Sequence, residues 1–269
     1  MTATPEINTD RAAQLVDLIT SATIVDLSVT TGERWPCHPY EGQKFGQFQM
    51  NWFTWPRGAF VEYVQVHDDH TGTHFDAPCH QIPPADSGLP AANEFGSITV
   101  EQVPLGQMIG PAAVIDVTAL VENAPKGEET RLKESPEILP EHILAWEEQH
   151  GALTGEEIVL FRSDWSDRYY VPLPEGWGYD RSHPAPRAET IELLHERGIR
   201  AIGTDGRGIG LMQDDYSPHW ACLGRNIVCI ENLTNLGSLP PRGALFVFAS
   251  HKFEGASGGM GRAFGFLTT

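Results

Sequence analysis

The sequence predicts an α/β fold with a mixed central sheet. Short apolar runs of strand-like composition alternate with segments of helical periodicity, as expected where helices cover a partly parallel sheet. Other apolar runs follow one another without a helix between them, which indicates antiparallel strands in the same sheet. The chain has 269 residues, 41% of them hydrophobic, and no long Pro-, Ser- or Gly-rich linker divides it. We therefore expect one domain over residues 1–269.

The first elements lead into a histidine-rich segment. A helix is predicted over residues 9–21, with Asn8 or Thr9 as its cap. Its apolar residues recur at helical spacing: Leu15, Val16, Leu18 and Ile19. Strands are predicted over residues 24–28 and 60–66.

The later elements continue the alternation. Buried strands are predicted over residues 112–117, 158–161, 199–203, 227–230 and 245–248. Helices are predicted over residues 140–150 and 188–197, each followed by a glycine that can end it. Ile143, Leu144 and Trp146 are expected on the inner side of the first of these helices. Residues 164–186 are predicted to be a long loop.

The charge and the termini restrict the class of partner. Eighteen Lys and Arg against 36 Asp and Glu give a formal net charge of -18, which repels nucleic-acid phosphates and anionic lipid. No apolar run approaches the ~20 residues of a membrane helix. The first residues lack the basic and apolar regions of a signal peptide, so a cytoplasmic location is expected. These observations favour a small-molecule substrate, with no nucleic acid and no membrane as partner.

The segment of residues 67–80 indicates a metal site, because four of the eleven histidines and three aspartates fall within it. Imidazole and carboxylate ligands together suit zinc, manganese or iron. Glycine and proline disfavour a helix here, and in an extended stretch His74 and Asp76 point the same way. His70, His74 and Asp76 therefore form a candidate facial triad with open coordination positions.

His80 has two possible roles in this site. It can be a fourth ligand, or a free base that takes the proton from a metal-activated water. We favour the base, since Pro78 interrupts the run before it. Cys79, between the two, is expected to pack inward as a small apolar side chain.

Two later segments carry weaker signals. Glu231 ends an apolar strand and lies 12 residues after His219. From the spacing alone, the Glu231 carboxylate can either project into a cleft or lie in water at the end of the strand. Gly206, Gly208 and Gly210 alternate with other residues but do not form the GxGxxG nucleotide motif.

Residues 70–80, His-Thr-Gly-Thr-His-Phe-Asp-Ala-Pro-Cys-His, resemble the HxGTHxDxPxH signature of the cyclase family at every fixed position. That family contains bacterial kynurenine formamidases, isatin hydrolases and lactam hydrolases. Further similarities cover the chain from about Ile24 to Phe266, including Asp26-Leu27-Ser28, Gly203-Thr204-Asp205 and Ile230-Glu231-Asn232-Leu233. The resemblance implies a swivelling β/α/β-type domain with a mixed central sheet, in a homodimer or homotetramer.

The resemblance also implies roles for individual residues. It makes His70, His74 and Asp76 metal ligands and His80 the catalytic acid/base. In two-metal members His219 and Glu231 hold a second ion, with Asp76 bridging. One or two Zn²⁺ or Mn²⁺ ions per chain are therefore expected. Trp35 matches an aromatic substrate contact.

The chain departs from typical kynurenine formamidases in length. It has extra residues around Val121–Pro140 and in the loop of residues 164–186, and Trp52 and Phe53 precede the metal segment. These aromatic residues, with Trp35, suggest a larger apolar substrate pocket. In length the chain is more similar to isatin-hydrolase-like and lactamase-like members.

We therefore expect a metal-dependent hydrolase that opens an amide C–N bond, most simply in a cyclic amide such as isatin or a lactam, with His80 as acid/base. If the protein is an enzyme of another kind, the alternatives are an N-formylkynurenine formamidase and a lactone hydrolase. If it is not an enzyme, the alternative is a metal-retaining protein that binds a small acid without turnover. An acid/base beside the triad favours the enzyme, because a binding site has no use for a proton shuttle.

Overall fold

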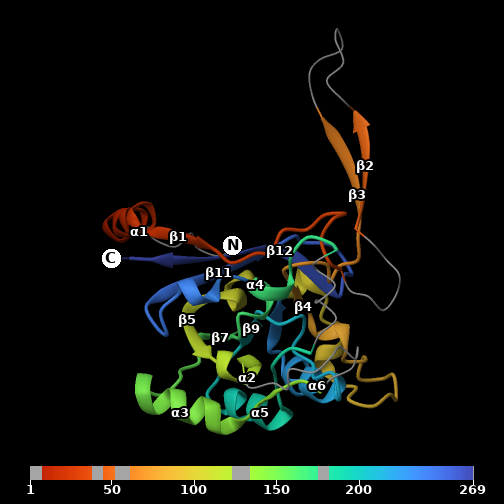
Figure 1. Cartoon of the computed structure of the whole chain (residues 1–269). Helices are drawn as coiled ribbons and strands as arrows, with labels where there is room; N and C mark the ends of the chain where they lie inside the picture. Colours follow the sequence, from red (N-terminus) through yellow and green to blue (C-terminus); the bar gives the residue numbers. More distant parts are fainter. Residues whose placement is uncertain (1–7, 38–44, 52–60, 123–133, 175–181, 269) are drawn as a thin grey trace, which may run out of the picture.

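The structure is a computed structural model in which residues 8–37, 45–51, 61–122, 134–174 and 182–268 are described. It has the mixed α/β architecture that the sequence predicts, built around an eight-stranded sheet (Figure 1). The strand order is β1-β12-β11-β5-β7-β9-β10-β4, and β12 pairs again with β4, which closes the sheet into a barrel-like arrangement. The strands are β1 (Thr23–Asp26), β4 (His74–Asp76), β5 (Ile109–Asp116), β7 (Ile158–Arg162), β9 (Ala201–Thr204), β10 (Val228–Glu231), β11 (Ala244–Ser250) and β12 (Gly258–Leu267).

The middle of the sheet is parallel and its two ends are antiparallel. β5, β7, β9 and β10 are parallel neighbours. Parallel neighbours need crossover connections, and helices α3 (Pro140–His150), α5 (Ala188–Glu196) and α6 (Tyr216–Leu223) lie in them. β11 and β12 follow each other without a helix between them and pair antiparallel, which makes the sheet mixed, as the sequence predicts.

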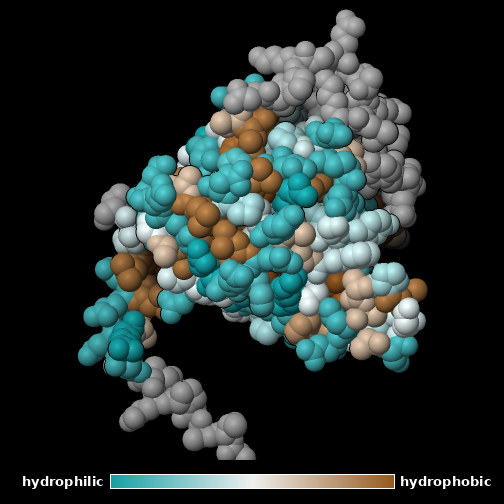
Figure 2. Space-filling view, turned by 90° about the horizontal axis from the view of Figure 1, so that it is seen from below, coloured by the Kyte–Doolittle hydropathy of each residue, from teal (hydrophilic) through white to brown (hydrophobic). Residues whose placement is uncertain are grey.

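The parallel strands are buried on both faces. Along β5, Ala112 and Val114 point into one hydrophobic cluster, and Ala113 and Ile115 point into a second. The first cluster includes residues from all seven strands of the closed ring, so it fills the enclosed face of the sheet. The second lies beneath α3 and α5, on the side of the molecule that Figure 2 shows, where hydrophilic residues surround small hydrophobic areas.

Two of the three predicted helices have the predicted limits, the third (α5) ends one residue earlier, and one side chain predicted to face inward does not. α1 (Thr9–Ser21) and α3 have the predicted limits, and Asn8 caps α1 by accepting a hydrogen bond from the Arg11 N–H at 3.0 Å. Leu144 does not face the core, since its side chain is 46% exposed. Ile143 and Trp146 are three residues apart and share the inner face of α3, and Leu144 lies about 100° around the helix from Ile143.

Several further elements go beyond the prediction. The expected loop of residues 164–186 contains a short helix, α4 (Trp165–Tyr169), and a strand, β8 (Ala185–Pro186), which pairs with β6 (Glu137–Ile138). The strand expected over residues 60–66 is β3 (Glu62–Val66), and it pairs with β2 (Gly46–Asn51) in a hairpin that projects from the body of the molecule (Figure 1). The remaining helix is α2 (Thr118–Glu122). Within the described ranges, no helix combines the length and the apolar character needed to cross a membrane.

Candidate metal centre

Strand β4 carries two deeply buried polar side chains. His74 is 2% exposed and Asp76 is fully buried. Side chains alternate along a strand, so these two share one face while Phe75 between them points into the enclosed core cluster. β4 is paired on both sides, with β10 and β12, and its backbone is therefore held in place.

The register between β4 and β10 brings a second carboxylate to this face. Glu231 is the direct partner of His74, and its Oε2 lies 3.4 Å from the His74 Nε2. The Glu231 Oε1 accepts a hydrogen bond from the Ile209 N–H at 2.7 Å. With 5% exposure, Glu231 is a buried carboxylate rather than a strand-end charge in water.

His70 reaches the same centre from the turn before β4. Its Nε2 lies 3.4 Å from the Asp76 Oδ1, and its Nδ1 lies 2.9 Å from the Asp69 Oδ1. Gly72 makes this turn with φ of +67°, and a Cβ on it would lie 2.2 Å from the Thr31 Cγ2. A left-handed backbone and this close contact both require glycine here.

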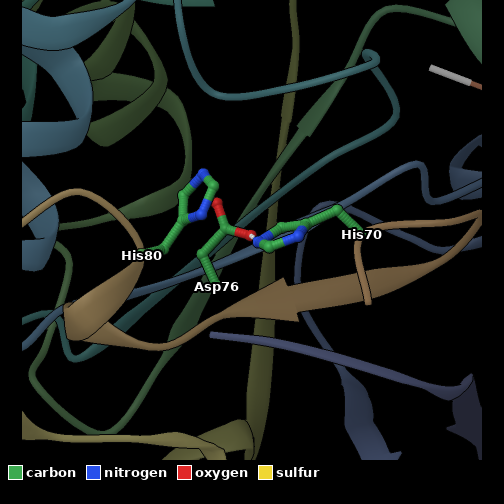
Figure 3. Close-up of side chains that lie close together, drawn as sticks. All are labelled: His70, Asp76 and His80. Atoms are coloured by element: carbon green, nitrogen blue, oxygen red, sulfur yellow. Dashed lines mark ion pairs between the residues drawn. The ribbon is translucent and has the colours of Figure 1, made fainter. Parts of the chain in front are cut away.

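His80 and His219 complete the cluster. His80 ends the 3₁₀ turn Pro78–His80, and its ring centroid lies 4.1 Å from that of His70. Figure 3 shows the Asp76 carboxylate between the imidazoles of His70 and His80. His219 enters from α6, with its Nε2 at 3.7 Å from the Asp76 Oδ2 and 3.6 Å from the Glu231 Oε1. The structure therefore brings together all six residues that the sequence singled out as ligands or acid/base.

Asp76 belongs to two groups that could hold a metal ion. His70, Asp76 and His80 form one, and His74, Asp76 and Glu231 form the other; within each, the potential ligand atoms lie within 4.8 Å of one another. His80 is therefore close enough to His70 and Asp76 to share a metal ion with them, so the geometry allows both a ligand role and an acid/base role.

The outer nitrogens of three imidazoles are fixed by protein acceptors. The Nδ1 atoms of His74 and His219 contact the carbonyl oxygens of Gly72 and Asp215 at 2.8 and 2.6 Å, and that of His70 contacts Asp69. This arrangement turns each Nε2 toward Asp76, as carbonyls and carboxylates do for histidine ligands of metals. In the described part of the chain, the Nε2 atoms of His70 and His74 and both Asp76 oxygens have no hydrogen-bond partner. Buried polar atoms without partners are costly, so this donor set fits a divalent cation.

The close charges shift the pKa values of the cluster. Burial alone would lower the pKa of His74, but the carboxylates of Asp76 and Glu231 raise it to about 10, and they also raise the pKa of His219. Burial opposes ionisation of Asp76, yet the surrounding imidazoles hold its pKa well below the usual value. Burial lowers the pKa of His80, which favours a neutral imidazole that can accept a proton.

The cluster lies in the wall of a cavity of about 490 Å³. His70, His74, His80, His219 and Glu231 line it. Other residues that were not predicted from the sequence also line it, among them Gln81, His183, Arg207, Asp215 and Asn232. For two of these a signal existed: Arg207 lies within the alternating glycines, and Asn232 directly follows Glu231.

The aromatic residues predicted to contact the substrate are not found in the wall of this cavity among the described residues. Trp35 stacks on Tyr170 with ring centroids 5.7 Å apart, in a small aromatic cluster with Trp165, and is not among the described residues that line the cavity. Trp52 and Phe53 lie outside the described residues. Cys79 packs against the enclosed core cluster, in agreement with its predicted inward position.

Comparison with known proteins identifies relatives of this chain in sequence and in fold. The family model described as "Putative cyclase" matches residues 25–210. The isatin hydrolase of Roseibium aggregatum is 29% identical over 210 residues, which cover 72% of this chain and 70% of that protein. The kynurenine formamidase of Salinibacter ruber is 30% identical over 183 residues, 64% of each chain. The solved structure of isatin hydrolase A from Labrenzia aggregata bound to benzyl benzoate is 28% identical, with a TM-score of 0.77 over 96% of this chain and 100% of that chain.

Proposed function

The chain belongs to the cyclase family and is a hydrolase of that family, and we propose that it opens the amide bond of a cyclic substrate such as isatin or a lactam. The observation that carries the proposal is the position of Asp76. Its buried carboxylate joins two groups of imidazole and carboxylate ligands beside a cavity large enough for a small ring.

We assign His70, His74 and Asp76 as the core metal ligands, with His219 and Glu231 as ligands of a second ion that Asp76 would bridge. The unpartnered Nε2 and carboxylate oxygen atoms support this assignment. Nitrogen and oxygen ligands accept both Zn²⁺ and Mn²⁺. When bound, such an ion lowers the pKa of a water and polarises a carbonyl.

His80 is the proposed acid/base. Its ring lies beside His70 and close to Asp76, and its lowered pKa keeps it neutral near pH 7. A neutral imidazole can take a proton from water and return it to the leaving nitrogen of the amide. The Asp76 carboxylate favours the protonated imidazole between these two steps.

The relatives support an amide as the substrate. Isatin hydrolase and kynurenine formamidase are named for two amides, a cyclic one and a formamide. The match to the first covers more of this chain, and a solved isatin hydrolase covers nearly all of it. We therefore place cyclic amides first and keep N-formylkynurenine and lactones as the alternative substrates.

Isatin ring opening, followed by absorbance, tests the proposal. The protein is stripped of metal and reconstituted separately with Zn²⁺ and Mn²⁺. We expect turnover with at least one ion and its loss on adding a chelator, and the faster ion identifies the cofactor. N-formylkynurenine and a simple lactone are assayed in parallel. Turnover of either, without turnover of isatin or a lactam, would replace the cyclic amide by that alternative.

A further inference from the structure

Helix α1 has an apolar side that the described part of the chain leaves exposed. All 13 residues of the helix are exposed. Four large apolar residues lie on one side of it, with exposures between 39 and 60%: Leu15, Val16, Leu18 and Ile19. Asp17 lies on the opposite side. An isolated helix of this length is only marginally stable in water, so α1 needs a surface to pack against.

The antiparallel end of the main sheet has an apolar outer face. On β5, Ile115 points into the cluster beneath α3 and α5, and Pro111 lies on the same face four residues earlier. The strand register extends this face into a row across three more strands, formed by Leu245 of β11, Phe266 of β12 and Ile24 of β1. Ile24 is 60% exposed, Leu245 is 37% exposed, and Phe266 is half-buried. The face that helices cover over the parallel strands is therefore apolar but exposed at β11, β12 and β1.

The next row of the same face continues the patch. Phe264 lies two residues before Phe266 on β12, and their rings meet edge-on with centroids 5.5 Å apart. Beside them, the exposed Arg262 pairs with Asp26 of β1, so the two charges on this face compensate each other. An apolar and locally neutral face can meet a second copy of an acidic chain without placing like charges together.

α1 and this sheet face do not meet within the described chain. Only Ala22 separates α1 from β1, and α1 lies at the start of that edge strand, away from α3 and α5 (Figure 1). As a helix of 13 residues, α1 is about 20 Å long. That length spans the three strands of the face, which lie about 4.8 Å apart. The chain thus carries a helix without a sheet to pack on and a sheet face without a helix to cover it.

We infer that α1 packs on the outer face of β11, β12 and β1 in a second copy of the chain, and that the α1 of that copy packs on the same face of the first. One twofold contact then covers both surfaces of both chains, because each chain supplies the surface that the other lacks. At roughly 50–100 Å² for each large apolar side chain of the two surfaces, the dimer buries on the order of 1,200 Å², the lower end of a stable interface. This contact is independent of the substrate and of the metal ions.

The charges on α1 disfavour a membrane as the covering surface. Helices that lie on membranes place Lys and Arg on their polar side, whereas α1 has Asp10 and Asp17 against Arg11. Anionic lipid attracts basic segments, so it offers nothing to this helix. A second copy of the chain, in contrast, offers an apolar face of matching length.

The mass of the full chain in solution, measured by light scattering over a range of concentrations, tests the interface. The wild type should be a dimer, or an assembly of such dimers. Leu15→Asp should halve this mass and weaken the association by at least ~100-fold, because each copy then places a carboxylate against an apolar face. Leu245→Asp should do the same from the sheet side. Leu144→Asp is the control, since it makes the same change at an exposed leucine of α3 and should keep the wild-type mass.

Mixing two variants separates a helix-on-sheet contact from a contact between two helices. An equimolar mixture of Leu15→Asp and Leu245→Asp should recover part of the dimer, because the intact helix of one chain fits the intact sheet face of the other. Leu15→Asp mixed with Leu18→Asp should not recover it. Circular dichroism and melting temperature identify the variants that remain folded.

Three outcomes would overturn the interface: a monomeric wild type, a wild-type mass that persists in folded Leu15→Asp or Leu245→Asp, or no recovery in the first mixture. Binding of a monomeric wild type to phosphatidylcholine vesicles, lost in Leu15→Asp, would overturn it in favour of a membrane.

Discussion

At the scale of single residues, Asp76 is the side chain that both candidate ligand groups share. It has no exposed surface, both of its oxygens lack hydrogen-bond partners within the described ranges, and both ligand groups include it. We expect Asp76→Asn to lower metal affinity by at least ~100-fold, because the neutral amide removes the shared charge. Metal titration monitored by elemental analysis measures this. Asp116→Asn, a change at an exposed carboxylate, is the control, and full occupancy in Asp76→Asn would contradict the assignment.

His80→Ala separates the two possible roles of His80. If His80 is the acid/base, kcat should fall by ~10²–10⁴-fold while metal content is unchanged. The same variant should lose an equivalent of metal if His80 is a ligand. Because His80 forms a candidate ligand group with His70 and Asp76, the metal content of His80→Ala must be measured together with its kcat.

His183 gives the metal-free protein a specific acid sensitivity. Its pKa is lowered by burial and by Arg207 to about 4, against 6.5 as the ordinary value. Between these values the unfolded chain takes up a proton that the folded chain does not, so stability decreases as the pH falls from about 6.5 to about 4. The full effect is on the order of 3 kcal/mol.

Urea unfolding of metal-free wild type and His183→Phe at about pH 7 and about pH 4.5 measures this effect. The wild type should lose more free energy of unfolding than the variant on acidification. An identical loss in both proteins would show that His183 is not held neutral. His195→Phe, the same change at an exposed histidine of α5, should behave as the wild type.

The same residues show which parts of a site can be predicted from sequence. His70, His74, Asp76 and His80 lie within one short segment, so local spacing is enough to identify them. Glu231 could be assigned only by resemblance, because its pairing with His74 depends on strand register. His183 has no local signal, since its position depends on Gly206 and Trp165 from other parts of the chain.

At the scale of elements, the turn before β4 determines where His70 lies. Gly72 combines a φ of +67° with a contact that excludes a Cβ. Gly72→Ala should destabilise the protein by roughly 1–3 kcal/mol and lower metal content, since the turn must shift away from Thr31. Thermal melting and elemental analysis measure both effects. In the double variant Gly72→Ala/Thr31→Ala the clash is removed but the unfavourable φ remains, so the stability should be restored only in part. Wild-type stability in the single variant Gly72→Ala would refute this account.

The elements that the sequence predicts well are those with a strong period. α1 and α3 have the predicted limits, and the buried parallel strands stand out as continuous apolar runs. α6 has no such pattern, because most of its residues are buried and its sequence contains Pro218. β2 was not predicted, although the apolar Phe48 and Met50 alternate with the polar Gln47 and Gln49 along it; among the described residues it pairs with β3. β4 differs from an ordinary buried strand, because His74 and Asp76 give it a buried polar face, which the proposed metal site explains.

At the scale of the whole molecule, the metal centre joins elements that are distant in sequence. β4, β10, α6 and the turn at His70 each contribute a ligand candidate. A metal that binds only the folded state stabilises it, by ~4 kcal/mol when its free concentration is about 1,000 times Kd. Chelation should therefore lower the melting temperature by about 8–16 °C, at about 2–4 °C per kcal/mol for a protein of this size. Asp76→Asn should show a much smaller chelator effect than the wild type, and an effect of wild-type size in this variant would place the stabilising ion elsewhere.

The second pairing of β12 has a consequence for how the protein is made on the ribosome. β4 has β12 as one of its two neighbours, and Asp69, which orients His70, accepts hydrogen bonds from Ser257 and Gly258, 188 and 189 residues later. The chain must be synthesised through residue 258 before these contacts can form. Such long-range pairing is slow to form, so a nascent chain carries His70, His74 and Asp76 through the synthesis of residues 77–258 without the contacts that orient His70. We therefore expect the proposed centre to capture a cation only after Ser257 and Gly258 have paired with Asp69, and the ions present at that moment to be the first it encounters.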